Sequence, residues 1–352
     1  MWAAEMLVQQ SQLEKDLTNP QPTLPKLELP VRARLKPAAS SPRSHLGVHA
    51  DDIFKSLIFT GTLSLVAIVG LIVFELIHNS RLTLAKFGWH FFVDDVWDPV
   101  AGQFGAWAFL YGTLVSSLIA LALAVPLGIA VAVFINELCP RSLRKSLSFA
   151  VELLAAIPSV IFGLWGIFVL APLLRSYVEP LLANYFGWTG LFSGPAYGIG
   201  MLAAGIILAI MVVPIICSIS REVMLTVPQQ QREGVLALGA TQWEMIRIGV
   251  LRNARAGILG AIILGLGRAL GETMAVTMVI GNSPDIAKSL FAPGYTMASV
   301  IANELNEAMT SLHRSALIEI GLALFIVTLI VNAFARLLVW TSKRGMRARV
   351  HV

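Results

Sequence analysis

The chain has few charged residues. Only 13% of its 352 residues are Asp, Glu, Lys or Arg, whereas 56% are hydrophobic and the mean hydropathy is +0.75. This composition excludes a soluble domain and predicts an all-α polytopic membrane protein. The net charge of +5 at pH 7 does not indicate a nucleic-acid partner, because positive charge in a membrane chain more often records which loops stay inside.

Cysteine and catalytic motifs are also scarce. The two cysteines, Cys139 and Cys217, have neither metal-ligand spacing nor a nearby partner, so we expect reduced thiols and no metal site. The sequence contains no nucleophile elbow and no Ser/His/Asp arrangement. We therefore expect a chain that is not an enzyme by itself.

No GxxxxGK[ST] motif is present, so the chain has no P-loop and we expect it to bind no cofactor. The glycines at 265 and 267 do not make a dinucleotide fingerprint, because the third glycine comes at 271 and no strand precedes them. Any ATP hydrolysis that drives this protein must occur on another chain.

The first 50 residues lack both a helical apolar period and the apolar core of a signal peptide. We predict a disordered cytosolic tail over 1–50, a first transmembrane helix and outer loop over 51–107, a transmembrane domain over 108–342, and a basic cytosolic C-terminus over 343–352. The outer loop carries aromatic residues, which suit either a membrane interface or contact with a binding protein.

Six apolar stretches are long enough to cross a bilayer of about 30 Å. The expected spans are 53–77, 109–135, 147–174, 196–219, 256–282 and 316–340. With both termini in the cytosol, twenty of the 26 Lys and Arg residues fall inside, as the positive-inside rule requires. An amphipathic segment around Ile301, Leu305 and Met309 is expected along the outer surface.

The fifth span carries two charges, Arg268 and Glu272. Each charge near the centre of a bilayer costs roughly 2.5 to 3.5 kcal/mol, so such residues usually have a function. Their spacing of four predicts that both side chains lie on one helical face, where they either form a structural ion pair or bind a ligand together. Beside them, small residues predict close helix packing at two sets of positions. These are 257, 261, 265 and 269, and the GxxxG at 267 and 271.

Two hydroxyl residues join this candidate site. Thr273 directly follows Glu272, and Ser159 directly follows Pro158, which must bend or break the third span. Broken membrane helices often border a transport pathway, so Ser159 is a candidate donor to an anion. A plain proline kink explains Pro158 equally well.

Between the fourth and fifth spans, residues 221–255 form a polar segment with helical propensity. Pro228 opens one helix, Gly239 and Ala240 interrupt it, and Thr241 is placed to cap a second helix that contains Trp243. This arrangement is typical of a helix-turn-helix projection, which is more than an ordinary connecting loop needs.

These residues resemble a known family. Glu233, Gly239 six positions later and Leu251 follow the spacing of the EAA loop in permeases of ABC importers, although Gly234, Val235, Gly249 and Arg252 depart from the family pattern. The run GLGRALGETMAVTMVIGN at 265–282 and the run AAIPSVIFGLWG at 155–166 resemble the phosphate permease subunits PstC and PstA. The layout before Gly112 is more similar to PstC.

The resemblance implies a type I ABC importer permease fold with both termini cytosolic. It makes 221–255 a coupling loop that docks on an ATPase through Glu233, Gly239, Ala240, Thr241 and Trp243. It makes Arg268, Glu272, Thr273 and Ser159 the residues that bind inorganic phosphate. The implied site is therefore inside the membrane, and the implied docking surface is cytosolic.

The same resemblance implies the partners. These are a PstA-like second permease, a PstB-like ATPase dimer that binds ATP and Mg, and a periplasmic phosphate-binding protein, all at a bacterial cytoplasmic (inner) membrane, with lipid around the spans and no nucleic acid. Molybdate or sulfate is the alternative cargo. A secondary anion transporter would explain the buried pair but not the coupling loop, and a membrane enzyme would need catalytic residues that the sequence lacks.

Overall fold

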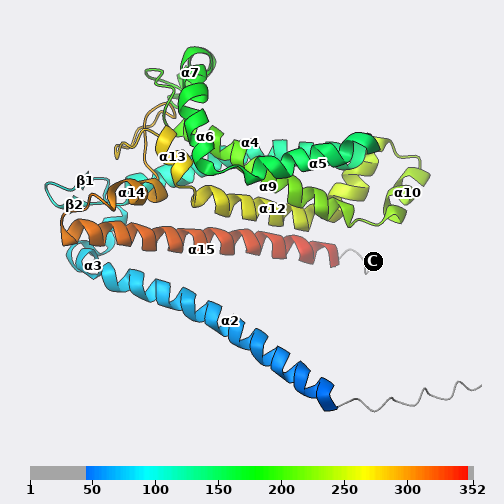
Figure 1. Cartoon of the computed structure of the whole chain (residues 1–352). Coiled ribbons are helices and arrows are strands. Elements are labelled where there is room, and N and C mark those ends of the chain that lie inside the picture. The colour runs from blue at the N-terminus through cyan, green and yellow to red at the C-terminus, as the bar shows by residue number, and fades with distance from the viewer. Residues whose placement is uncertain (1–44, 348–352) are drawn as a thin grey trace, which may run out of the picture. The chain divides into compact units, whose positions relative to one another are not determined.

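The computed structural model describes residues 45–347, which are mostly helical (Figure 1). Six helical stretches in this part of the chain are long and apolar enough to cross a membrane, which confirms the predicted number. They are Asp52–Asn79, Trp107–Leu138, Ser159–Thr189, Met201–Leu225, Gln242–Leu270 and Ser311–Leu337.

The chain divides into two units, residues 1–67 and 68–352. The described part of the first unit is helical and belongs to α2 (His45–Asn79). Residues 45–50 therefore continue the first helix, and their assignment to the tail was wrong. The predictions of disorder for 1–44 and of a basic tail for 348–352 lie outside the described residues.

After the end of α2, the second unit has an outer segment that is more structured than a loop. It contains α3 (Arg81–Phe87), the 3-10 helix η1 (Gly88–Phe92) and a two-stranded hairpin, β1 (Trp97–Asp98) and β2 (Gln103–Phe104). Asp98 holds the hairpin turn, because its Oδ1 accepts hydrogen bonds from the backbone N–H groups of Val100 and Ala101 at 2.8 and 2.9 Å. Aromatic rings of this segment pack in the core beside Phe109.

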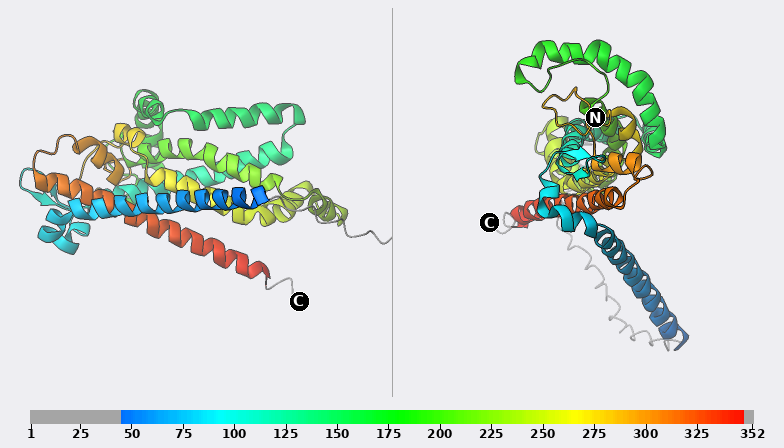
Figure 2. Two further views of the ribbon diagram at one scale, coloured as in Figure 1. Left: turned by 60° about the horizontal axis from the view of Figure 1, so that its bottom comes forward. Right: turned by 90° about the vertical axis from the view of Figure 1, so that its left-hand side faces the viewer.

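Helix α9 (Met201–Leu225) is the central helix of the unit, because most of its side chains are buried. It packs between α4 (Trp107–Val133) and α12 (Arg252–Leu270), and the three run side by side in Figures 1 and 2. A Cβ added at Gly265 would lie 2.8 Å from Val212 Cγ1 of α9, so the predicted small-residue stripe does allow close packing. A Cβ at Gly267 would meet nothing within 4 Å, so the predicted GxxxG faces no helix of the described chain.

The third span differs from the prediction. Ile157 is extended (ψ 130°) because a residue before proline avoids the helical region, and the chain breaks there completely. Residues 141–156 form a separate helix before the break, α5 (Arg141–Ala156). Beyond the break, α6 (Ser159–Trp165) leads away from the direction of α5 (Figure 1), and the candidate span covers Ser159–Thr189 where 147–174 was expected.

This third stretch is continuous but irregular. The π-helical segments η3 (Gly166–Leu170) and η4 (Leu174–Val178) alternate with the helices α7 (Ala171–Leu173) and α8 (Glu179–Phe186). The 3-10 helix η5 (Gly187–Thr189) ends it. The helical stretch therefore extends to Thr189, beyond the predicted end of the span at 174.

The fifth span also differs from the prediction. One helical stretch, formed by α11 (Gln242–Glu244), the π-helical η6 (Met245–Leu251) and α12, ends at Leu270 and not at Asn282. After a break at Gly271 come α13 (Met274–Val279), α14 (Met297–Glu304) and the long α15 (Ser311–Arg347). The first turn of α14 is buried, so this segment packs into the unit and does not simply lie on its surface.

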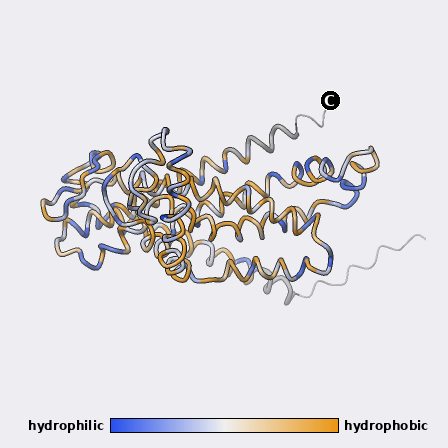
Figure 3. The backbone as a smooth tube through the Cα atoms, turned by 90° about the horizontal axis from the view of Figure 1, so that it is seen from above, coloured by the Kyte–Doolittle hydropathy of each residue, from blue (hydrophilic) through white to orange (hydrophobic). Residues whose placement is uncertain are grey.

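The second unit has two polar ends. The hairpin and α14 lie at one end, and α10 (Gln229–Ala237) lies at the other (Figure 1). Figure 3 shows hydrophobic colouring along the helices between these ends and hydrophilic segments at both of them. This is the arrangement expected of a helical unit that spans a membrane.

Candidate functional site

Arg268 and Glu272 form an ion pair across the end of a helix. Arg268 lies in the last turn of α12, and Glu272 directly follows Gly271, where the helix stops. Arg268 Nη2 lies 3.1 Å from Glu272 Oε2. The pair forms as predicted, but on a break and not on one face of a continuous helix, because the helical hydrogen bonding ends at Gly271.

The two side chains differ in exposure. The Glu272 side chain is 3% exposed, whereas the Arg268 side chain is 47% exposed. Glu272 Oε1 also accepts a hydrogen bond from the backbone N–H of Ala275 at 3.3 Å, so the carboxylate joins the end of α12 to the start of α13. A guanidinium carries five N–H donors, and the ion pair with Glu272 uses only those on Nη2.

Thr273 is part of the same break. Its Oγ1 donates to the carbonyl of Gly271 at 3.3 Å, and its own carbonyl accepts from the Thr277 hydroxyl at 2.8 Å. The Thr273 side chain is half-buried. It therefore helps to shape the turn, and it lies next to the ion pair in the chain.

Ser159 comes from the neighbouring broken helix. It is the first residue of α6 and is half-buried. Helices α6 and α13 pack closely: a Cβ at Gly163 would lie 3.1 Å from the Cα of Ala275, and one at Gly166 would lie 2.6 Å from Val279 Cγ1. The later of these two glycines contacts the later residue of α13, so the two helices run in parallel and begin at the same end. No hydrogen bond among the described residues joins Ser159 to Arg268 or Glu272.

This geometry combines the features of an anion site in a membrane. Two helices are interrupted, both resume on the same side, and an arginine at the break has free donors. Interrupted helices of this kind position backbone N–H groups and cations toward anionic substrates.

The coupling loop has the predicted turn and cap. Gly239 has φ +85°, a left-handed conformation that glycine adopts without strain. Thr241 Oγ1 accepts from the Glu244 N–H at 3.3 Å, and Glu244 Oε2 accepts from the Thr241 N–H at 2.8 Å, which completes a capping box. The sequence therefore predicted this helix start correctly.

Several side chains of this loop are exposed. Glu233 on α10 is exposed and Ala240 is half-buried. Two apolar side chains at the turn, Leu238 and Trp243, are 89% and 63% exposed. Exposed apolar side chains beside a charged helix at the polar end of a membrane protein are typical of a protein-docking surface.

The sequence did not predict how this loop is attached. Arg232 Nη2 lies 3.1 Å from Oε1 of Glu137, which lies in η2 (Phe134–Leu138), the π-helical continuation of α4. Both side chains are largely buried, at 16% and 8% exposure. Arg232 also donates to the carbonyl of Met224 at 2.8 Å. Farther along the loop, Asn253 Nδ2 donates to Gln231 Oε1 at 2.9 Å.

These contacts fix α10 to the ends of α4 and α9 and to the start of α12. The glutamate at 137 was an available signal, because a lone acid at the end of an apolar span needs a partner. A second missed contact joins α9 to α5: Arg221 binds Glu152 at 3.2 Å and the Ser148 hydroxyl at 2.6 Å.

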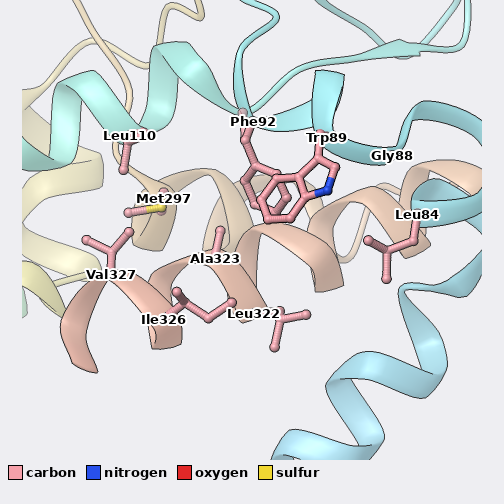
Figure 4. A pocket seen from close by; sticks show the side chains of 11 residues that line it. Leu84, Gly88, Trp89, Phe92, Leu110, Met297, Leu322, Ala323, Ile326 and Val327 are labelled. Carbon is pink, nitrogen blue, oxygen red and sulfur yellow. The ribbon is translucent and has the colours of Figure 1, made fainter. Parts of the chain in front are cut away.

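One cavity of about 540 Å³ is apolar (Figure 4). Its lining residues come from α3, η1, α14, α15 and the start of α4, and include Leu84, Trp89, Leu110, Met297 and Ile326. It offers no charge or donor set for an anion. Among residues 45–347, no group of three or more His, Cys, Asp or Glu could hold a metal, and both cysteines are buried free thiols.

Comparison with known proteins defines the class of this fold. Residues 124–341 match the family described as the binding-protein-dependent transport system inner membrane component. A solved bacterial ABC transporter that imports the acidic polysaccharide alginate has the same fold, with a TM-score of 0.56 and 18% identity over 84% of this chain and 98% of that one.

Two curated relatives are closer in sequence, and each is called phosphate transport system permease protein PstC. The one from Mesorhizobium japonicum is 47% identical over 290 residues, which cover 81% of this chain and 89% of the relative. The one from Haemophilus influenzae is 43% identical over 293 residues, which cover 82% and 93%. The chain belongs to the binding-protein-dependent transport permeases and, within them, to the PstC family.

Proposed function

We propose that this chain translocates inorganic phosphate across the bacterial cytoplasmic (inner) membrane as one of two permease subunits of an ATP-driven importer. The observation that carries the proposal is the half-exposed Arg268 at the helix break, held by a buried Glu272 at 3.1 Å. A guanidinium presents N–H groups in a fork that matches two oxygens of a tetrahedral oxyanion.

The remaining subunits follow from the family and from the docking surface. The family membership implies ATPase and substrate-binding partners. We assign these as a PstB-like ATPase dimer, which binds ATP and Mg, and a periplasmic phosphate-binding protein. We assign a PstA-like chain as the second permease. The exposed side of Arg268 and the unpartnered Gly267 would then face that second permease, so the anion site would be completed between the two subunits.

Glu272 supports phosphate over sulfate or molybdate as the cargo. Phosphate keeps at least one proton near neutral pH, and a carboxylate can accept a hydrogen bond from a P–OH group. A fully deprotonated oxyanion meets the same carboxylate only with repulsion. The buried carboxylate beside Arg268 therefore favours a protonated oxyanion.

The test is ATP hydrolysis by the purified four-subunit complex in nanodiscs. Phosphate-loaded binding protein should stimulate hydrolysis several-fold above the rate with empty binding protein. If sulfate or molybdate loaded on its own binding protein stimulated hydrolysis and phosphate did not, the cargo assignment would be wrong. If no ATPase co-purified with the permease, the importer assignment itself would fail.

A further inference from the structure

A polar cavity of about 590 Å³ is lined by residues of the hairpin, α14 and the start of α15. The hairpin and α14 lie at the end of the unit opposite α10 (Figure 1). The cavity is formed by β1 and the hairpin turn, the loop after α13, α14 and the start of α15. Its lining residues are Trp97, Pro99, Val100, Asn282, Pro284, Tyr295, Asn303, Glu304, Glu307, Met309, Thr310 and His313. We call this cavity the acidic socket.

Glu304 is a fixed acidic group of the socket. Its Oε2 accepts a hydrogen bond from Trp97 Nε1 at 2.9 Å and lies 3.1 Å from His313 Nε2. The His313 ring in turn stacks on Phe104 of β2, with 5.4 Å between ring centroids. These contacts join the hairpin, α14 and α15, so the wall of the socket is preformed.

The socket has more acceptors than donors. Glu307 is exposed and has no ion pair or side-chain hydrogen bond within the described part of the chain. Asn282 Oδ1 is a buried atom without a hydrogen-bond partner. Burial, and after it the nearby carboxylates of Glu304 and Glu307, raise the pKa of Tyr295 to about 12. The occupant that suits this lining is a cation rich in N–H donors.

The rim of the socket is apolar and exposed. Val100 is 98% exposed and Met309 is 95% exposed, and neither lies in a membrane-spanning helix. Exposed apolar side chains outside the membrane spans suit a protein–protein contact, and in such contacts an anchor residue of the partner often fills a recess that the surrounding contacts shield from water. A bound metal ion would not need this rim.

We propose that the acidic socket receives a lysine or arginine side chain of the periplasmic binding protein when that protein docks. This inference rests on the proposed function, because it takes the binding protein as a partner. The negative lining also excludes the socket as an entry point for the anionic cargo. The docking contact and the cargo path are therefore separate at this face.

The first test measures the affinity of the complex in nanodiscs for the phosphate-loaded binding protein. Glu307→Lys should weaken binding at least tenfold and make the affinity less dependent on salt, because a repelling charge replaces an attracting one. Asp95→Lys is the matched control, since Asp95 is an exposed acid of the same outer segment that does not line the socket. It should leave the affinity within about twofold.

A photo-crosslinker at Met309 supplies the second test. It should form a product with the binding protein, whereas a crosslinker at Leu238, at the coupling end, should not. Unchanged affinity of the Glu307→Lys complex would overturn the proposal, and so would loss of wild-type binding on addition of EDTA, which would identify a metal site. Both results leave the proposed function standing if loaded binding protein still stimulates the ATPase.

Discussion

Arg232 on α10 and Glu137 on η2, the continuation of α4, form a largely buried ion pair, with 3.1 Å between Nη2 and Oε1. The Asn136 amide donates to the same Glu137 oxygen at 2.7 Å. Through this pair, α10 is fixed to the end of a membrane-spanning helical stretch. Under the proposed docking on an ATPase, we therefore expect a displacement of α10 to be passed to this membrane helix.

Removing Arg232 should uncouple transport from hydrolysis. Arg232→Met leaves Glu137 buried without its cation, which should cost roughly 3 kcal/mol of stability and loosen α10. We expect ATPase activity that no longer responds to loaded binding protein, together with uptake reduced at least tenfold. The double variant Arg232→Met/Glu137→Gln removes the stranded charge and should regain stability but not coupling. Full coupling in the single variant would show that the pair has no such role.

Gly239→Pro should prevent assembly with the ATPase. Gly239 has φ +85°, which proline cannot adopt, and its N–H donates to the carbonyl of Leu236 at 2.9 Å. The measurement is the amount of ATPase that co-purifies with equally expressed permease. Gly234→Ala is the control, because a Cβ there would meet nothing within 4 Å. A proline variant that retained both the ATPase and uptake would contradict the docking assignment.

Glu272→Gln should weaken discrimination against sulfate. In the parent, the Ala275 N–H donates to Glu272 Oε1 at 3.3 Å. The amide oxygen of the variant can still accept this hydrogen bond, while the negative charge is lost. Phosphate uptake should persist, and excess sulfate should begin to inhibit it in an assay that does not depend on the binding protein. If the variant transports phosphate and stays as indifferent to sulfate as the parent, Glu272 only orients Arg268.

Glu319 should be a site where substitution stabilises the protein. It is fully buried in α15, and neither carboxylate oxygen has a hydrogen-bond partner among the described residues. Glu319→Leu should therefore raise the thermal unfolding temperature, by an effect of roughly 1 to 4 kcal/mol. Glu179→Leu is the matched control with the opposite sign, because both Glu179 oxygens accept from the Gly198 N–H, at 3.0 and 3.2 Å. A destabilised Glu319→Leu variant would show that this carboxyl has a partner in the assembled complex.

The sequence predicted the features that depend on local chemistry. Six apolar stretches of spanning length, the helix interruption at Gly239 and the Thr241 cap all follow from nearby residues, and the structure confirms them. The four-residue spacing also predicted the contact between Arg268 and Glu272. The roles of these two residues in transport stay predictions.

The features that the sequence did not predict depend on distant residues. Whether Pro158 kinks or breaks a helix is decided by what packs beside it, and here α13 packs against α6 beyond the break. The end of α12 at Gly271 was missed because residues 274–279 resume a helix with the same apolar character. Arg232, the partner of Glu137, lies more than ninety positions away in the sequence, and Trp97, a partner of Glu304, lies 207 positions away. At such separations the spacing of residues in the sequence does not predict a contact.

The central claim is that Arg268 binds phosphate during translocation. Its most direct test is ATP-dependent uptake of radiolabelled phosphate by proteoliposomes that contain the assembled importer. Arg268→Ala should abolish uptake, and Arg268→Lys should reduce it at least tenfold, because an ammonium keeps the charge but not the fork of donors. Assembly and basal ATPase activity should stay near the parent level in both variants. Unchanged phosphate uptake by Arg268→Ala would contradict the account.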